Sequence, residues 1–192
     1  MQPLSASKML APERILFISS ALWSLGDGML GPLFAVFAGQ VGGDVLSITW
    51  AWAVYLGVTG VGMMFTGKLG DKYGHHILSV LGYAITAVAT FGYIFVSDKW
   101  ELLVVQVVSG IGLALCNPTW YALYDRYSGD GNNDGEVWGL ASGGGYIAQA
   151  IAIITGGLIV TYGSFTLLFF TMGCLMTLST LYQAKILKYK NL

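Results

Sequence analysis

The chain has 192 residues, of which 55% are hydrophobic and only 10% are charged, and its mean hydropathy is +0.67. A soluble domain carries about 25% charged residues, so this composition excludes ordinary water-soluble folding and indicates an integral membrane protein. The formal net charge is −1 and no long basic tract is present, so we expect no nucleic acid among the partners.

A membrane-spanning helix needs about 20 mostly apolar residues, and six stretches of the chain are long enough. These stretches do not alternate and are about twice as long as a membrane strand, which argues against strands. We therefore predict an all-α, polytopic membrane protein with residues 1–14 as an N-terminal cytoplasmic segment, 15–184 as a six-helix bundle and 185–192 as a basic cytoplasmic tail. The predicted spans are residues 15–38, 45–67, 77–96, 102–124, 137–162 and 165–184.

The basic residues predict the orientation of the bundle, because cytoplasmic loops of membrane proteins carry an excess of Lys and Arg. Six spans place both termini on the same side. With both termini in the cytoplasm, only Lys99 of the 9 Lys and Arg residues lies outside. We therefore predict a multi-pass protein of the cell (inner) membrane with both termini cytoplasmic.

The first span carries an acid near its middle, Asp27, between Gly26 and Gly28. A charged group at this depth costs at least about 2.5 kcal/mol, so it normally faces a partner or water and marks a pathway. Pro32 removes one helical hydrogen bond and allows a bend just beyond the acid. We interpret Asp27 as a substrate, ion or proton group in a cavity; the alternative is a neutral Asp hydrogen-bonded to a neighbouring helix.

Polar residues also recur at intervals of three and four in the fourth and fifth spans, which places them along one face of each helix. Together with Asp27 on a third helix, these two polar stripes predict a shared wet interior. Hydrogen bonding between helices remains the alternative for each residue taken singly. The predicted substrate or ion pathway comprises Asp27, Gln106, Asn117, Tyr121, Tyr146 and Gln149, and the predicted bending points are Pro32 and Pro118.

Nothing in the sequence argues for an enzyme. No nucleophile has a plausible base, and no glycine-rich phosphate loop follows a strand. Cys116 and Cys174 lie inside apolar runs and are interpreted as core residues. Residues 130–135 match the first half of a calcium loop, but Ala141 stands where that loop needs a bidentate Glu. We therefore expect no catalytic residue, no cofactor and no metal site.

A short polar stretch between the second and third spans, residues 67–76, is predicted to be a tight turn at the membrane surface. It resembles the loop motif of the major facilitator superfamily, Gly-x-x-x-Asp-Arg/Lys-x-Gly-Arg/Lys-Arg/Lys. His75 and His76 depart from the basic residues that end the family pattern. The matching positions are Gly67, Asp71, Lys72 and Gly74.

Other parts of the chain match the same family less completely. Asp27 followed by Gly31-Pro32 is similar to the first span of many members. Gln106 stands where proton-coupled members have Arg, and the fifth span lacks the Gly-Pro that antiporters carry before paired glycines. These two departures weaken a claim of proton-coupled drug export.

The resemblance covers the whole chain but only one half of a twelve-span member, in which two six-span bundles face each other across a midplane site. A single bundle would leave its polar face against lipid. The chain starts with Met and ends in a basic tail, so we expect a natural ending and a half-size member that pairs with a second copy of itself in C2 symmetry. A fragment of a twelve-span transporter is the alternative.

The resemblance further implies secondary-active transport of a small molecule or ion by alternating access, in contact with membrane lipid. It implies that Asp71 forms a cytoplasmic gate with the start of the fifth span of the second copy, near Val137. A non-transporting membrane subunit or scaffold is the other functional hypothesis. The residues leave a cation, a sugar, an amino acid and an amphiphilic drug open as substrates.

Overall fold

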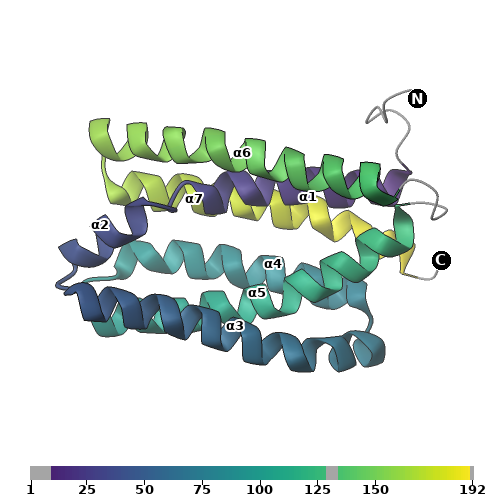
Figure 1. The fold of residues 1–192 in the computed structure, drawn as a ribbon, viewed down its shortest axis with the longest axis horizontal. Helices are drawn as coiled ribbons and strands as arrows, with labels where there is room; N and C mark the ends of the chain where they lie inside the picture. The colour runs from purple at the N-terminus through teal and green to yellow at the C-terminus, as the bar shows by residue number, and fades with distance from the viewer. Residues whose placement is uncertain (1–9, 129–133, 191–192) are drawn as a thin grey trace.

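The computed structural model describes residues 10–128 and 134–190, and within these ranges the chain is helical with no strand. The predicted all-α fold is confirmed. The long helices run along one common axis (Figure 1). The elements are α1 (Ala11–Gly28), α2 (Leu33–Gln40), α3 (Val45–Tyr73), α4 (His75–Gly92), η1 (Tyr93–Phe95), α5 (Lys99–Tyr127), α6 (Asp134–Tyr162), α7 (Phe165–Gln183) and η2 (Ala184–Tyr189).

Five of the helical segments are long and apolar enough to cross a membrane, and α1 with α2 provides a sixth crossing. The prediction of one continuous first span is wrong, because α1 and α2 are separate helices bent by 47°. Pro32 lies at the break and has no N–H to donate, so the ladder of backbone hydrogen bonds cannot continue through it. The predicted bend at Pro32 therefore corresponds to a complete interruption of the helix.

The contacts between helices follow a twofold pattern that relates two three-helix repeats. The first repeat is α1 with α2, α3 and α4, and the second is α5, α6 and α7. α1 packs on α6 and α7, α5 packs correspondingly on α3 and α4, and α4 packs on α7. Figure 1 shows the result as two groups, α1, α6 and α7 on one side and α3, α4 and α5 on the other. Each group combines helices from both repeats.

Glycine allows α4 and α5 to approach more closely than side chains would permit. A Cβ atom at Gly82 would lie 2.5 Å from the backbone nitrogen of Cys116 and 2.7 Å from the carbonyl oxygen of Gly112. Small residues at such contacts bring helices into van der Waals contact in lipid, where no hydrophobic force draws them together. The α4–α5 contact therefore depends on the absence of a side chain at Gly82.

A buried group of hydrogen bonds, the polar clamp, joins α1, α4 and α7. The Ser19 hydroxyl donates to Gln183 Oε1 at 2.5 Å, and Gln183 Nε2 donates to the Ser79 hydroxyl at 2.8 Å. The Ser179 hydroxyl donates to the Ser19 carbonyl oxygen at 2.7 Å. All four residues are buried, so each polar side chain is satisfied within the bundle rather than by water.

Three helices begin with side-chain caps at the end of the bundle away from Ala11 and Tyr189 (Figure 1). Asp44 caps α3 by accepting from the Ser47 N–H at 2.7 Å, Asp98 caps α5 and Ser164 caps α7. The hydrogen bonds from Ser47 hold the pKa of the exposed Asp44 carboxyl below its ordinary value. These polar residues explain why the helices start where they do.

The prediction of a tight turn over residues 67–76 is wrong. α3 continues to Tyr73, so Gly67, Asp71 and Lys72 lie on a helix. Only Gly74, at a φ of +94° that favours glycine, separates α3 from α4. α3 has 29 residues and is about 43 Å long. Because the hydrocarbon core is about 30 Å thick, its polar end can remain helical and still reach the membrane surface.

The segment after α7 packs against the bundle. Ile186 of η2 is fully buried in a cluster with Leu16 and Tyr124. The Tyr127 hydroxyl donates to the Tyr189 carbonyl oxygen at 3.2 Å and lies 2.8 Å from His76 Nε2. Residues 1–9 of the expected N-terminal segment, residues 191–192 of the expected tail and residues 129–133 of the predicted calcium-loop-like connection lie outside the described residues.

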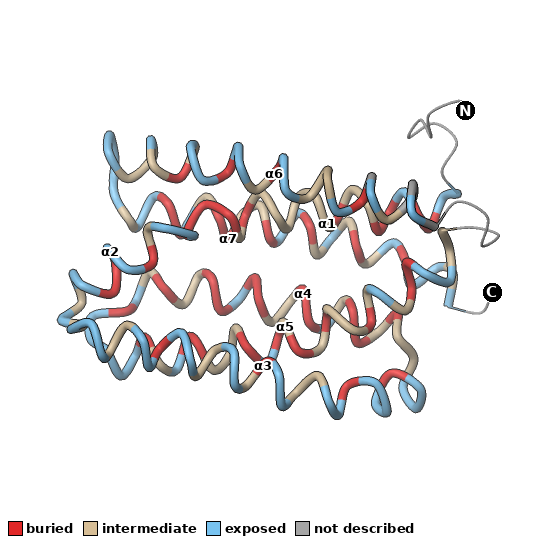
Figure 2. The backbone as a smooth tube through the Cα atoms, in the orientation of Figure 1, coloured by how far each residue is buried: buried red, intermediate tan, exposed pale blue. Residues whose placement is uncertain are grey.

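Burial is uneven across the bundle. Only 11% of the most apolar stretch of α3 and 17% of that of α6 are buried, against 50% for α4. Figure 2 shows long exposed segments along both helices. A Cβ atom at seven of their glycines would meet no atom within 4 Å: Gly57, Gly60 and Gly67 in α3 and Gly135, Gly139, Gly143 and Gly157 in α6. Those glycines therefore do not serve packing within this bundle.

We predict that Gly82→Ala lowers the stability of the bundle by about 1–3 kcal/mol, because the new methyl group would force α4 and α5 apart. Thermal unfolding of the purified protein in detergent measures this as a lower Tm. Gly39→Ala is the control, since a Cβ atom there meets nothing within 4 Å. Equal Tm values for both variants would contradict the role assigned to Gly82.

Candidate functional site

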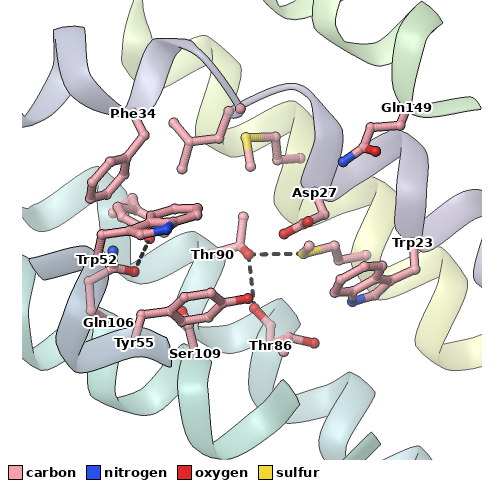
Figure 3. Close-up of a pocket in the computed structure, with 15 residues that line it drawn as sticks. Trp23, Asp27, Phe34, Trp52, Tyr55, Thr86, Thr90, Gln106, Ser109 and Gln149 are labelled. Carbon is pink, nitrogen blue, oxygen red and sulfur yellow. Dashed lines mark hydrogen bonds between the residues drawn. The ribbon is translucent and has the colours of Figure 1, made fainter. Parts of the chain in front are cut away.

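Two neighbouring cavities occupy the centre of the bundle. The first, the inner cavity, has a volume of about 130 Å³ and is lined by residues from α1 to α7 (Figure 3). The second, the vestibule, has a volume of about 420 Å³. The two cavities share Trp23, Asp27, Tyr55 and Gln149 as lining residues. They therefore form one site with an inner and an outer part.

Asp27 lies in the last turn of α1, directly before the break, and lines both cavities. Among the described residues its carboxylate has no hydrogen-bond or ion-pair partner. Gly28 brings α6 close to this point, because a Cβ atom there would lie 2.9 Å from Gln149 Cγ. Figure 3 shows the Asp27 and Gln149 side chains projecting toward the same space from two helices. The alternative of an Asp bonded to a neighbouring helix has no support in this geometry.

All six residues of the predicted pathway line this site. Asp27, Gln106 and Gln149 line the inner cavity, and Asn117, Tyr121 and Tyr146 join Asp27 and Gln149 around the vestibule. The structure thus brings these six polar residues together around one site. Their role in moving a solute stays a prediction.

Gln106 is held at the inner end by Tyr93, whose hydroxyl donates to Gln106 Oε1 at 2.8 Å. This bond leaves the Gln106 Nε2 donor without a partner among the described residues, although the side chain is only 2% exposed. The indole N–H of Trp23 is buried and unpaired in the same way. Unpaired buried donors are rare, and both of these belong to residues that line the inner cavity.

Aromatic residues form much of the wall, and the sequence did not identify them. Trp23, Phe34, Trp52 and Tyr55 line the inner cavity. Trp23 precedes Asp27 by four residues, which places both on one helical face, so this neighbour could have been found from spacing alone. Trp52 and Tyr55 lie on α3, whose apolar pattern gives no sign of an inward face.

The two proline positions differ in their relation to the site. Leu30, Gly31 and Phe34, around the break at Pro32, line the inner cavity. α5 remains helical through Pro118, which follows Asn117 of the vestibule. The structure therefore shows an interrupted helix at the first proline and a continuous one at the second.

The four residues of the predicted gate do not line either cavity. The Asp71 side chain is 80% exposed at the end of α3, and its Oδ1 lies 3.4 Å from His75 Nε2. The Lys72 ammonium lies 5.0 Å from the centre of the Tyr73 ring. Gly67 faces outward on the same helix, and Gly74 ends it. In the described part of the chain, no three His, Cys, Asp or Glu residues are arranged to hold a metal ion.

A multi-pass helical bundle built from two repeats around a polar central site defines a class of membrane transport proteins. The family model of the Major Facilitator Superfamily matches residues 16–189, and the chain belongs to this family. This family consists of membrane transporters rather than enzymes.

Known relatives are distant in sequence. The chain is 22% identical over 165 residues to the multidrug resistance protein MdtG of Salmonella typhimurium, a match that covers 76% of this chain and 41% of that protein. It is 29% identical over 104 residues to the uncharacterized MFS-type transporter MJ1560 of Methanocaldococcus jannaschii, covering 54% of this chain and 27% of that protein. It is 27% identical over 108 residues to the uncharacterized MFS-type transporter YvkA of Bacillus subtilis, covering 56% and 24%. The chain thus spans less than half the length of these relatives.

We predict that a cysteine at position 149 reacts at least ten-fold faster with a water-soluble thiol reagent than a cysteine at position 104. Thiolates form in water, and Gln149 lines the site, whereas Val104 is 63% exposed on the outside of α5, where lipid or detergent covers it. Labelling rates of Gln149→Cys and Val104→Cys, both in a Cys116→Ser/Cys174→Ser background, provide the measurement. Equal rates would mean that the cavity is closed to water.

Proposed function

We propose that this protein moves a small solute across the cell membrane by secondary-active alternating access and that two copies form the working transporter. The observation that carries this proposal is the Asp27 site, where a half-buried acid at the centre of the bundle has no hydrogen-bond or ion-pair partner among the described residues. An unpaired acid in the membrane marks a substrate or ion pathway by default. The site is also open on one side, since the vestibule residues Tyr146 and Tyr121 are 73% and 51% exposed.

A second copy would cover the open side of the site. Polar side chains such as Ser142 and Tyr146 would otherwise face lipid, which is unfavourable. α3 and α6 supply suitable contact faces, because their outward glycines allow another helix to approach closely. A C2 pair would place α3 of one copy against α6 of the other, with the two sites facing each other.

The gate assigned to Asp71 fits this arrangement. Asp71 follows Gly60 and Gly67 by eleven and four residues, so all three share the outward face of α3. In the pair, this face would meet the beginning of α6 of the second copy, where the N-terminus of a helix favours a negative charge. We propose the cell (inner) membrane as the location and the cytoplasm as the side of both termini, on the distribution of Lys and Arg.

The paired arrangement predicts a specific cross-link. Asp71→Cys with Gly139→Cys should form disulfides between two copies, because both positions would lie on the contact faces at the cytoplasmic end. Oxidation in native membranes, followed by gel electrophoresis, should give a band of doubled mass.

Leu69→Cys with Gly139→Cys is the matched control, since residue 69 lies about 160° around α3 from the face of residues 60, 67 and 71. Equal cross-linking in both pairs would indicate random collision. A purified protein that stays monomeric in lipid nanodiscs would count heavily against the pair.

Alternating access predicts that one position is reachable from both sides of the membrane. A membrane-impermeant thiol reagent should label Gln149→Cys, in a background without other cysteines, in right-side-out and in inverted vesicles. Impermeability is checked with Gly39→Cys, which should react from one side alone. Labelling of residue 149 from a single side would favour the scaffold hypothesis, because a fixed subunit has no second conformation.

A further inference from the structure

The charged side chain that lines the site is an acid, with no basic residue beside it among the described lining residues. Asp27 is the one acid that lines either cavity, and the described lining residues include no Lys, Arg or His. A carboxylate removed from water without a compensating charge is strongly unfavourable. A proton or a cationic ligand relieves that cost, so a ligand with a positive charge is stabilised at Asp27.

The surroundings of Asp27 suit a diffuse rather than a strongly hydrated cation. Phe34, Trp52 and Tyr55 form a continuous row of rings, with centroid distances of 5.3 Å between Phe34 and Trp52 and 5.5 Å between Trp52 and Tyr55. Trp23 adds an indole that lines both cavities (Figure 3). Aromatic rings attract a cation through their negative faces, and this attraction is strongest where water is excluded.

The remaining polar groups restrict the chemical class of the ligand further. A divalent cation such as Ca²⁺ is usually held by several oxygens that include more than one carboxylate, and Asp27 is the one carboxylate of the described lining. An amino acid would bring a second carboxylate for which the lining offers no cationic partner, and an anion would be repelled by Asp27. A sugar would leave the charge of Asp27 unbalanced. The two unpaired donors, Gln106 Nε2 and Trp23 Nε1, are available to an acceptor atom on the ligand or to water.

We propose that the Asp27 site binds a monovalent organic cation with aromatic or apolar substituents, its charge placed between Asp27 and the rings of Trp23, Trp52 and Tyr55. The two adjoining cavities together take the cation, with its apolar substituents in contact with the aromatic wall. That the bound cation is a transported substrate rests on the proposed function. Binding of the cation to the site needs neither transport nor a change of conformation.

Tetraphenylphosphonium and tetraphenylborate test the proposal, because the two ions have nearly the same shape and opposite charge. Equilibrium dialysis against the protein in lipid nanodiscs, with empty nanodiscs subtracted, measures specific binding of each ion. We expect saturable binding of tetraphenylphosphonium and no specific binding of tetraphenylborate. Equal binding of the two ions, or no specific binding of either, would overturn the proposal.

Two pairs of variants locate the binding. Asp27→Asn should weaken tetraphenylphosphonium binding at least ten-fold, whereas Asp125→Asn, which removes the same charge from an exposed position outside both cavities, should leave binding unchanged. Trp52→Leu should weaken binding several-fold, whereas Trp50→Leu, on the same helix but lining neither cavity, should not.

Asp27→Glu keeps the charge if Asp27→Asn fails to fold, and it should retain binding. Unchanged affinity in a folded Asp27→Asn protein would place the cation elsewhere and overturn the assignment. The cross-link and the two-sided labelling do not depend on this ligand, so a failure of the cation assignment and a failure of the transport mechanism give different results.

Discussion

Helices in a membrane cannot rely on the hydrophobic effect to hold them together, since lipid chains are as apolar as the side chains that would be buried. Contact must come from close packing and from hydrogen bonds between helices. The bundle meets this constraint in two ways. Gly82 and Gly112 bring the backbones of α4 and α5 together, and the polar clamp around Gln183 ties α1, α4 and α7. Both repeats are joined by these contacts.

The central site differs from the rest of the bundle in how its polar groups are hydrogen-bonded. The buried hydroxyls of Ser19, Ser79 and Ser179 are all paired. In contrast, Asp27, Gln106 Nε2 and Trp23 Nε1 have no partner among the described residues, and all three line the inner cavity. In the part of the chain that the structure describes, the one other buried side-chain atom without a partner is His75 Nδ1 at the start of α4, outside both cavities. Unpaired polar groups gathered in one cavity are expected where binding, rather than stability, decides the residues.

Much of the fold could be predicted from the sequence, because the length of each apolar run and the 3.6-residue helical period are strong signals. The same period predicted helix faces for Gln149 and Asn117 that line the vestibule together with Asp27. It could not find Trp52 and Tyr55, because α3 is apolar around its whole circumference and gives no distinct inward face. Spacing along one helix also cannot show which residues on other helices complete a cavity.

The motif at residues 67–76 was misread for a related reason. Charges and glycines between two apolar runs predict a loop, but a helix longer than the hydrocarbon core can carry polar residues in its last turns. The outward position of glycines in α3 and α6 could not be predicted either, since a sequence does not say which helix faces remain uncovered.

The continuity of α3 has a mechanical consequence. Between its cap at Asp44 and its end at Gly74 the helix contains no proline and makes no break, so it behaves as a stiff rod of about 43 Å. Tilting such a rod by about 10° around its middle displaces each end by roughly 4 Å in opposite directions. Trp52 and Tyr55 of this helix line the inner cavity together with Asp27, and Asp71 lies near the other end of the helix. A ligand that moves those rings and tilts α3 would therefore also move Asp71 at the membrane surface.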